Sequence, residues 1–191
     1  MSRRRTVAMQ LAMRGLPLLL VSCSASTITS MLAEMSLEDK VGQMTQLDIA
    51  EVLANDCPVR LDQIKLKDVL SSQRLGSFFN SPFTGGPRCG RSGWTASEWR
   101  AVIAQIQAEA KAQGLPPLLF GIDSVHGANY VQGATVLPQQ LGLAASFDEH
   151  LAQRVAMLTA KDSRAANLQW IFAPILGVMV HPMWPRVRPH P

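Results

Sequence analysis

The chain has 191 residues, of which 47% are hydrophobic, 17% charged and 6% aromatic. This composition excludes an intrinsically disordered chain, and three cysteines are too few for a dense disulfide scaffold. The formal net charge is +4, but six basic residues and no acidic ones lie within the first 22 and the last nine positions. The body between them holds 12 basic and 14 acidic residues. A nucleic-acid-binding domain carries its positive charge on the folded face, so we expect no nucleic-acid partner.

Residues 1–22 have the pattern of an export signal. Three arginines at 3–5 form a charged start, an apolar stretch follows that is purest at 16–21, and small residues come next. The uninterrupted apolar run is much shorter than the ~20 residues that a membrane-spanning helix needs. We therefore expect a secreted or extracytoplasmic protein without a stable membrane span. A cytosolic terminus or an organelle transit peptide remains an alternative, and a bacterial type of lipid anchor at Cys23 is a minor one.

Three segments of the body carry the same helix-start signal, a hydroxyl residue followed three positions later by an acid. They begin at Ser36, Thr95 and Ser146, with the acids Asp39, Glu98 and Glu149. Apolar residues spaced by three and four positions after each start predict one buried stripe per helix. The expected stripes are Val41 and Met44 in the first helix, Trp99, Val102, Ile103, Ile106 and Ala110 in the second, and Leu151, Val155 and Leu158 in the third.

Short apolar runs between these helices predict strands at 75–79, 118–122 and 170–174. The runs are continuous rather than alternating, as expected for strands that are covered on both faces. Strands that alternate with helices indicate an α/β fold with a parallel sheet and right-handed crossovers. We expect Trp99 and Trp170 to lie in the core. The last ten residues contain four prolines, and no further helix or strand is expected there.

The segment 120–127 carries the most informative polar residues. It reads Phe-Gly-Ile-Asp-Ser-Val-His-Gly, so the second predicted strand delivers Asp123 at its carboxyl end, with His126 three residues later. Ligand sites of parallel α/β proteins form at that edge of the sheet. Asp123 is therefore a candidate for accepting hydrogen bonds from a polar ligand, such as two adjacent sugar hydroxyls, through its two oxygens. The alternative, equally weighted, is that Asp123 caps the following turn and that His126 is a structural residue.

Other patterns for chemistry are weak. The sequence has no nucleophile elbow, no dinucleotide-binding fingerprint and no Walker-type phosphate loop. The Gly-rich segment 85–91 is basic, but a solvated loop is a better interpretation than a phosphate site. Cys57 and Cys89 lie in loops and are able to pair in an oxidising compartment, or to remain as thiols. No cysteine and histidine spacing suits zinc, so we expect neither a metal nor a cofactor.

Several motifs in one order resemble the amino-terminal barrel domain of glycoside hydrolase family 3, the β-glucosidase and exo-β-glucanase group. The resemblance runs from about Met35 to about Arg186. The segment 121–127, Gly-Ile-Asp-Ser-Val-His-Gly, is close to the family's Gly-Ile-Asp-Ala-Val-His-Gly. The other matching segments are 36–46 (like the family's first helix), 76–80 (like its first strand), 133–138, 142–146 and 170–178.

The resemblance implies a partial (β/α)8 TIM-type barrel, with about the first three β/α units only. It also implies retaining hydrolysis of terminal, non-reducing β-D-glucosyl residues from a β-glucoside or β-glucan oligosaccharide, without a cofactor. In this family the aspartate of the Gly-Ile-Asp motif holds glucose hydroxyls, and that role falls on Asp123. The last arginine of the family's Arg-Asp-Pro-Arg-Trp-Gly-Arg segment belongs to the same subsite and matches Arg186.

This chain departs from the family at 180–186, where it reads Val-His-Pro-Met-Trp-Pro-Arg. The family's nucleophile and acid/base come from later segments, so the resemblance gives this chain no catalytic residue. We expect a signal-like segment at 1–22, a partial barrel domain at 35–186 and a Pro/Arg-rich tail at 187–191. Three strands of eight cannot close a barrel, and the expected function is that of a fragment, inactive alone. The alternative is a non-catalytic glycan-binding or inactive relative.

Overall fold

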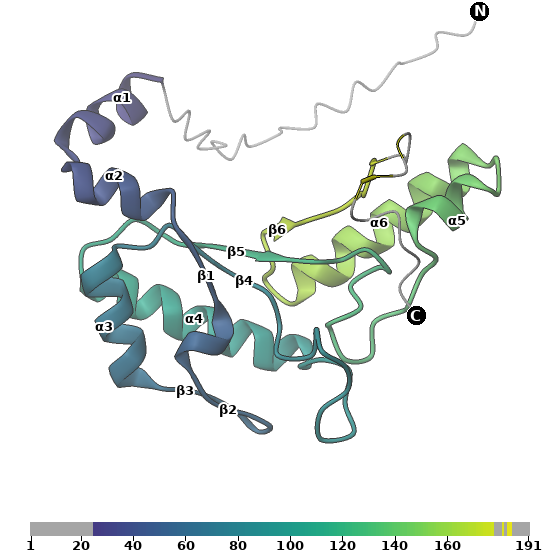
Figure 1. Ribbon diagram of the computed structural model, residues 1–191, viewed down its shortest axis with the longest axis horizontal. Coiled ribbons are helices and arrows are strands. Elements are labelled where there is room, and N and C mark those ends of the chain that lie inside the picture. Colours follow the sequence, from purple (N-terminus) through teal and green to yellow (C-terminus); the bar gives the residue numbers. More distant parts are fainter. Residues whose placement is uncertain (1–24, 178–180, 182, 185–191) are drawn as a thin grey trace, which may run out of the picture. The chain divides into compact units, whose positions relative to one another are not determined.

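The computed structural model describes residues 25–177, 181, 183 and 184 (Figure 1). The chain divides into two units, residues 1–35 and 36–191. Of the first unit, the structure describes the helix α1 (Ala25–Glu34). The expected signal segment and tail lie outside the described residues, as does Arg186. Among the described residues, no helix is both long and apolar enough to cross a membrane.

The second unit is built on a four-stranded parallel sheet in the order β1-β4-β5-β6. The strands are β1 (Gln46–Asp48), β4 (Ser77–Phe79), β5 (Leu119–Ile122) and β6 (Trp170–Ile171). The α/β class and the parallel sheet are confirmed. The predicted count of three strands is wrong, because β1 precedes the segment that we expected to be the first strand. The predicted strand at 170–174 is shorter than expected, since its ladder to β5 ends at Ile171.

Helices follow the first three strands of the sheet and give three β/α units before β6 (Figure 1). The unpredicted helix α3 follows β1 and packs beside α4, while α6 follows β5. A small antiparallel hairpin of β2 and β3 lies between β1 and α3. The bounds are α2 (Leu37–Gln43), the 3-10 helix η1 (Ile49–Val52), β2 (Leu53–Asp56), β3 (Val59–Leu61), α3 (Gln63–Gln73), α4 (Ala96–Ala112), α5 (Gln140–Ala144) and α6 (Glu149–Ala165).

Two of the three predicted helix starts are confirmed. Ser36 and Thr95 are the N-caps of α2 and α4, each with a complete capping box. The third is wrong, because Asp148 caps α6 by accepting a bond from the Leu151 amide at 2.9 Å. The hydroxyl of Ser146 instead accepts a bond from the Asp148 amide at 3.2 Å. The serine therefore supports the capping residue and does not cap the helix itself.

The predicted apolar stripes are buried only where another described element covers them. All five stripe residues of α4 are buried against the sheet. The three stripe residues of α6 are half-buried, and Val41 and Met44 of α2 are exposed, so the prediction for α2 is wrong. Trp170 is 42% exposed and does not belong to the core. The core is therefore centred between α3, α4 and strands β4 and β5, while β6 and α6 remain partly uncovered.

Four aromatic rings pack edge to face through this core. The ring centroids of Phe83 and Trp94 are 6.2 Å apart, those of Trp94 and Trp99 4.5 Å, and those of Trp99 and Phe120 5.4 Å. Each such pair contributes roughly 0.5–1.5 kcal/mol beyond the area it buries. The indole nitrogen of Trp99 donates to the carbonyl oxygen of Tyr130 at 2.9 Å. The row of rings thereby joins α4 to β5 and to the loop that follows β5.

Candidate functional site at the carboxyl edge of the sheet

Three neighbouring strands end in polar residues at one edge of the sheet. Asp48 is the last residue of β1, Asn80 follows β4, and Asp123 follows β5. Because the strands are parallel and adjacent in the order β1-β4-β5, their carboxyl ends lie at the same edge. The structure therefore brings the predicted residue Asp123 to an edge that it shares with two polar residues the sequence analysis did not single out.

Asp123 is exposed and forms no hydrogen bond or ion pair with another described residue. The alternative that it caps the following turn therefore has no supporting contact in the described part of the chain. The pKa of Tyr130 is raised, first by burial of the phenol and then by the negative charge of Asp123. Both carboxylate oxygens of Asp123 thus remain free as acceptors within the described part of the chain.

Asp48 and Asn80 are bonded to each other. The Asn80 Nδ2 donates to the Asp48 Oδ2 at 2.6 Å, and the other carboxylate oxygen accepts from the Ala50 amide at 2.8 Å. Asn80 has a φ of 76°, in the left-handed region that asparagine tolerates better than most residues. Both Asp48 oxygens are therefore engaged in holding the edge together. This pair was not predicted because β1 was not predicted. Asn80, directly after the apolar strand β4, carried the signal of a polar residue at a strand end, whereas the short and mostly polar β1 gave none for Asp48.

His126 has a structural role in the described chain. Its ring Nδ1 lies 3.2 Å from the carbonyl oxygen of Leu137, and the Leu137 amide donates to the His126 carbonyl at 2.9 Å. The neighbouring Gly127 has a φ of 74°, and a Cβ there would come within 2.8 Å of the Thr135 carbonyl oxygen. These contacts fix the returning segment 133–138 against the motif. Of the two titratable residues in the motif, Asp123 has no hydrogen-bond partner among the described residues, whereas His126 helps to hold the loop.

Two buried side-chain atoms near this region have no hydrogen-bond partner among the described residues, the Gln46 Nε2 and the Asn129 Oδ1. A Cβ at Gly121 would lie 3.2 Å from the Gln46 amide nitrogen and would overlap the ring of Phe172. The glycine thus lets Gln46 and Phe172 meet over β5, just before Asp123. An unsatisfied buried polar group costs about 1–3 kcal/mol, so these two amides are locally unfavourable features of the described structure.

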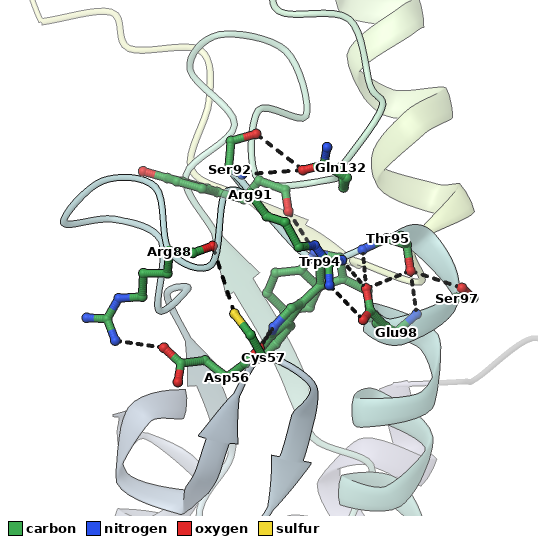
Figure 2. A network of polar contacts seen from close by, with 12 residues as sticks. Asp56, Cys57, Arg88, Arg91, Ser92, Trp94, Thr95, Ser97, Glu98 and Gln132 are labelled. Atoms are coloured by element: carbon green, nitrogen blue, oxygen red, sulfur yellow. Dashed lines mark hydrogen bonds and ion pairs between the residues drawn. The ribbon is translucent and has the colours of Figure 1, made fainter.

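The basic segment 85–91 uses its charges within the protein (Figure 2). The Arg88 Nη1 lies 2.7 Å from the Asp56 Oδ2, and the Arg91 Nη1 donates to the Glu98 Oε1 at 3.0 Å. The bond from Arg91, followed by those from Thr95, lowers the pKa of Glu98 to about 2. Both arginines are therefore neutralised by partners, which favours the interpretation of 85–91 as a solvated loop over a phosphate site.

No group of His, Cys, Asp and Glu side chains among the described residues is arranged to hold a metal ion. A cavity of about 490 Å³ lies between α5, α6 and the end of β6. Its walls are mostly apolar and offer few partners for sugar hydroxyls. Residues lining this cavity include Ser124, Gln140, Leu143, Val155, Ile171 and Pro174. The candidate site therefore rests on the polar edge around Asp123 rather than on this cavity.

Comparison with known proteins finds two relatives that are both named beta-glucosidases. The chain is 37% identical over 170 residues to a lysosomal beta glucosidase of Dictyostelium discoideum, a match that covers 87% of this chain and 20% of that protein. It is 25% identical over 159 residues to a periplasmic beta-glucosidase of Salmonella typhimurium, covering 83% and 17% of the two chains. The chain thus spans about a fifth of the length of these relatives.

A solved structure shares the fold. The exo-1,3/1,4-beta-glucanase of a Pseudoalteromonas species superimposes with a TM-score of 0.62 at 27% identity, covering 78% of this chain and 17% of that chain. Residues 36–189 match the sequence profile described as the glycosyl hydrolase family 3 N terminal domain. This range holds the whole parallel sheet and the edge that carries Asp123. The chain therefore belongs to glycosyl hydrolase family 3, through the N-terminal domain of that family.

Proposed function

We propose that this chain supplies part of the glucose-binding subsite of a retaining β-glucosidase. The hydrolysed substrate is a β-glucoside or β-glucan oligosaccharide with a terminal, non-reducing glucosyl residue. Asp123 holds two adjacent hydroxyls of that residue, and Arg186 contributes to the same subsite. We assign neither the nucleophile nor the acid/base to a residue of these 191, so the chain alone is expected to bind sugar without cleaving it.

One observation carries the proposal: Asp123 is exposed at the carboxyl edge of β5 without a bonded partner among the described residues. An ionised carboxylate without protein partners binds hydroxyl groups through charge-assisted hydrogen bonds, which are stronger than neutral ones. The relatives support the substrate class, since two of them are named beta-glucosidases and one an exo-beta-glucanase.

We also propose that the chain is exported through residues 1–22. The two β-glucosidase relatives named above are described as lysosomal and periplasmic, which agrees with a place outside the cytoplasm. Fusion of residues 1–30 to a reporter enzyme, followed by fractionation of cells and medium, tests this proposal. Reporter activity that stays in the cytosol would contradict it.

The binding role is tested by titrating the 191-residue chain with glucose and following saturation-transfer NMR signals of the sugar. We expect weak binding by the wild type and a loss of at least tenfold in affinity for Asp123→Asn. The matched control is Asp68→Asn, which removes an exposed carboxylate from α3 and should not alter binding. Equal affinities for the wild type and Asp123→Asn would refute the assignment of Asp123.

The alternative, a non-catalytic glycan-binding relative, is separated by a second measurement. In this measurement the chain is joined to a C-terminal segment of a family 3 β-glucosidase, and hydrolysis of an aryl β-glucoside is assayed. The assay tests whether the sheet edge at Asp123 supports catalysis. Hydrolysis that is lost in Asp123→Asn favours the subsite of an enzyme. Glucose binding by the wild type with no hydrolysis in any such fusion favours the binding protein.

A further inference from the structure

Two of the three cysteines meet beside the β2–β3 hairpin. Cys57 lies in its turn, and Cys89 lies in the loop 85–91. The Cys57 Sγ is 3.9 Å from the carbonyl oxygen of Arg88, the residue joined to Cys89 (Figure 2). One position earlier, Asp56 forms its ion pair with Arg88 at 2.7 Å. The two segments therefore run past each other with residues 56 and 57 opposite residues 88 and 89.

Electrostatics agrees with the proximity of the two segments. The pKa of Cys57 is raised to about 11, first by a side-chain hydrogen bond with Cys89 and then by burial. Cys57 is half-buried, whereas Cys89 is exposed on the loop. The exposed sulfur is the one that an external oxidant reaches first, and the half-buried sulfur stands next to it to complete the exchange.

We propose that Cys57 and Cys89 form a disulfide that ties the hairpin turn to the loop 85–91. The oxidant is a low-molecular-weight disulfide such as oxidised glutathione. The Cys89 thiol loses a proton and attacks one glutathione sulfur, releasing the first glutathione thiolate. Cys57 then loses its proton and attacks the Cys89 sulfur, releasing the second. The two cysteines together give up two protons and two electrons, and one glutathione disulfide becomes two thiols.

The cross-link closes a loop of the chain that contains one strand of the parallel sheet. The chain between the two cysteines contains β3, α3 and β4, and β4 lies between β1 and β5 in the sheet. A disulfide stabilises a fold mainly by restricting the unfolded chain, and longer loops gain more. For a closed loop of this length we expect a rise in Tm on the order of 10 °C.

Peptide mapping tests the pairing directly. The full chain is incubated with oxidised glutathione, alkylated and digested with trypsin without reduction. Trypsin places the three cysteines in separate peptides, 15–40 with Cys23, 41–60 with Cys57 and 89–91 with Cys89. We expect 41–60 linked to 89–91 as the main product. Cys57 and Cys89 recovered only in alkylated form would overturn the proposal.

The unfolded chain provides an internal control. Cys57 follows Cys23 by 34 residues and precedes Cys89 by 32, so loop-closure entropy favours neither pairing in urea. Both linked products should then form in about equal amounts. A native chain that also gives equal amounts would show that the fold does not select the pair, and this result would overturn the proposal.

Thermal unfolding with and without a phosphine reductant provides a second readout. The oxidised wild type and the matched control Cys23→Ser should both lose on the order of 10 °C in Tm on reduction. Cys57→Ser and Cys89→Ser should show no dependence on the reductant. A wild-type Tm that is insensitive to reduction, or a dependence that survives in Cys57→Ser, contradicts the cross-link.

Discussion

The start of α4 offers a sharp test of how the fold is stabilised, through the substitution Glu98→Gln. The Glu98 Oε1 accepts a bond from the Arg91 Nη1 at 3.0 Å. Its Oε2 accepts from the Arg91 Nη2 and from the amide and hydroxyl of Thr95, at 2.7 and 2.8 Å for the latter two (Figure 2). Glutamine retains one acceptor oxygen and loses the charge. The substitution therefore breaks the ion pair and weakens the capping box while preserving side-chain volume.

The pKa of Glu98 sets the size of the effect. It falls from 4.5 to about 2 in the folded chain, first through the bond from Arg91. At ~1.4 kcal/mol per pH unit, this gives an upper bound of about 3 kcal/mol. The Glu98 side chain is 26% exposed, so solvent screens part of the interaction. We expect a loss of about 1–2 kcal/mol in the free energy of unfolding near neutral pH, comparable to one helix cap plus one surface ion pair.

The pH dependence gives the result that would refute this reasoning. Because the folded pKa lies below the unfolded one, the contribution is complete above about pH 5 and is lost as the pH falls toward about 2. Urea unfolding followed by circular dichroism should therefore show the deficit of Glu98→Gln at neutral pH and a smaller one at about pH 3. Glu51→Gln, at an exposed position of the 3-10 helix η1, is the matched control with little expected change. A deficit that is the same at both pH values would refute the ionic origin.

Two further predictions concern the candidate edge and the backbone packing beneath it. Asp123→Asn should lower the pKa of Tyr130, because it removes a negative charge that opposes formation of the phenolate. Tyr130 is the chain's single tyrosine, so an ultraviolet titration reports its pKa directly, and an unchanged curve would show that the two side chains are not neighbours. Gly76→Ala should cost about 2 kcal/mol or more in urea unfolding, because the new Cβ overlaps the backbone carbonyl of Gln43, whereas Gly85→Ala, with no atom within 4 Å, should be nearly neutral.

The sequence predicted those elements whose own residues carry the signal. Helix α4 was recognised because Thr95 and Glu98 define its start and its stripe is long and regular, and the structure buries that stripe completely. Strand β5 was recognised as a continuous apolar run, and it delivers Asp123 at the expected edge. Motif order also identified the family, and the match over residues 36–189 confirms it.

The elements that were missed depend on partners that are distant in the sequence. Strand β1 has three residues, of which only Leu47 is apolar, and its extended form is fixed by the ladder to β4 some thirty residues later. Helix α3 buries only Leu66 and Leu70, and its other apolar residues, Ile64 and Val69, are exposed and half-buried. The exposure of Val41 in α2 likewise depends on what packs over the helix, which periodicity alone does not report.

The candidate site shows why residue types alone did not separate function from structure. Asp48, Asp123 and His126 are all polar residues that lie at or shortly after strand ends, and residue type by itself does not separate them. The structure separates them by their hydrogen bonds, because Asp48 is bonded to Asn80 and His126 holds the segment around Leu137. Asp123 alone of the three has no such contact among the described residues, although its charge is close enough to raise the pKa of Tyr130. A carboxylate that the fold leaves without a partner at a strand end keeps both oxygens as acceptors, and for this reason we propose Asp123 as the hydroxyl-binding residue.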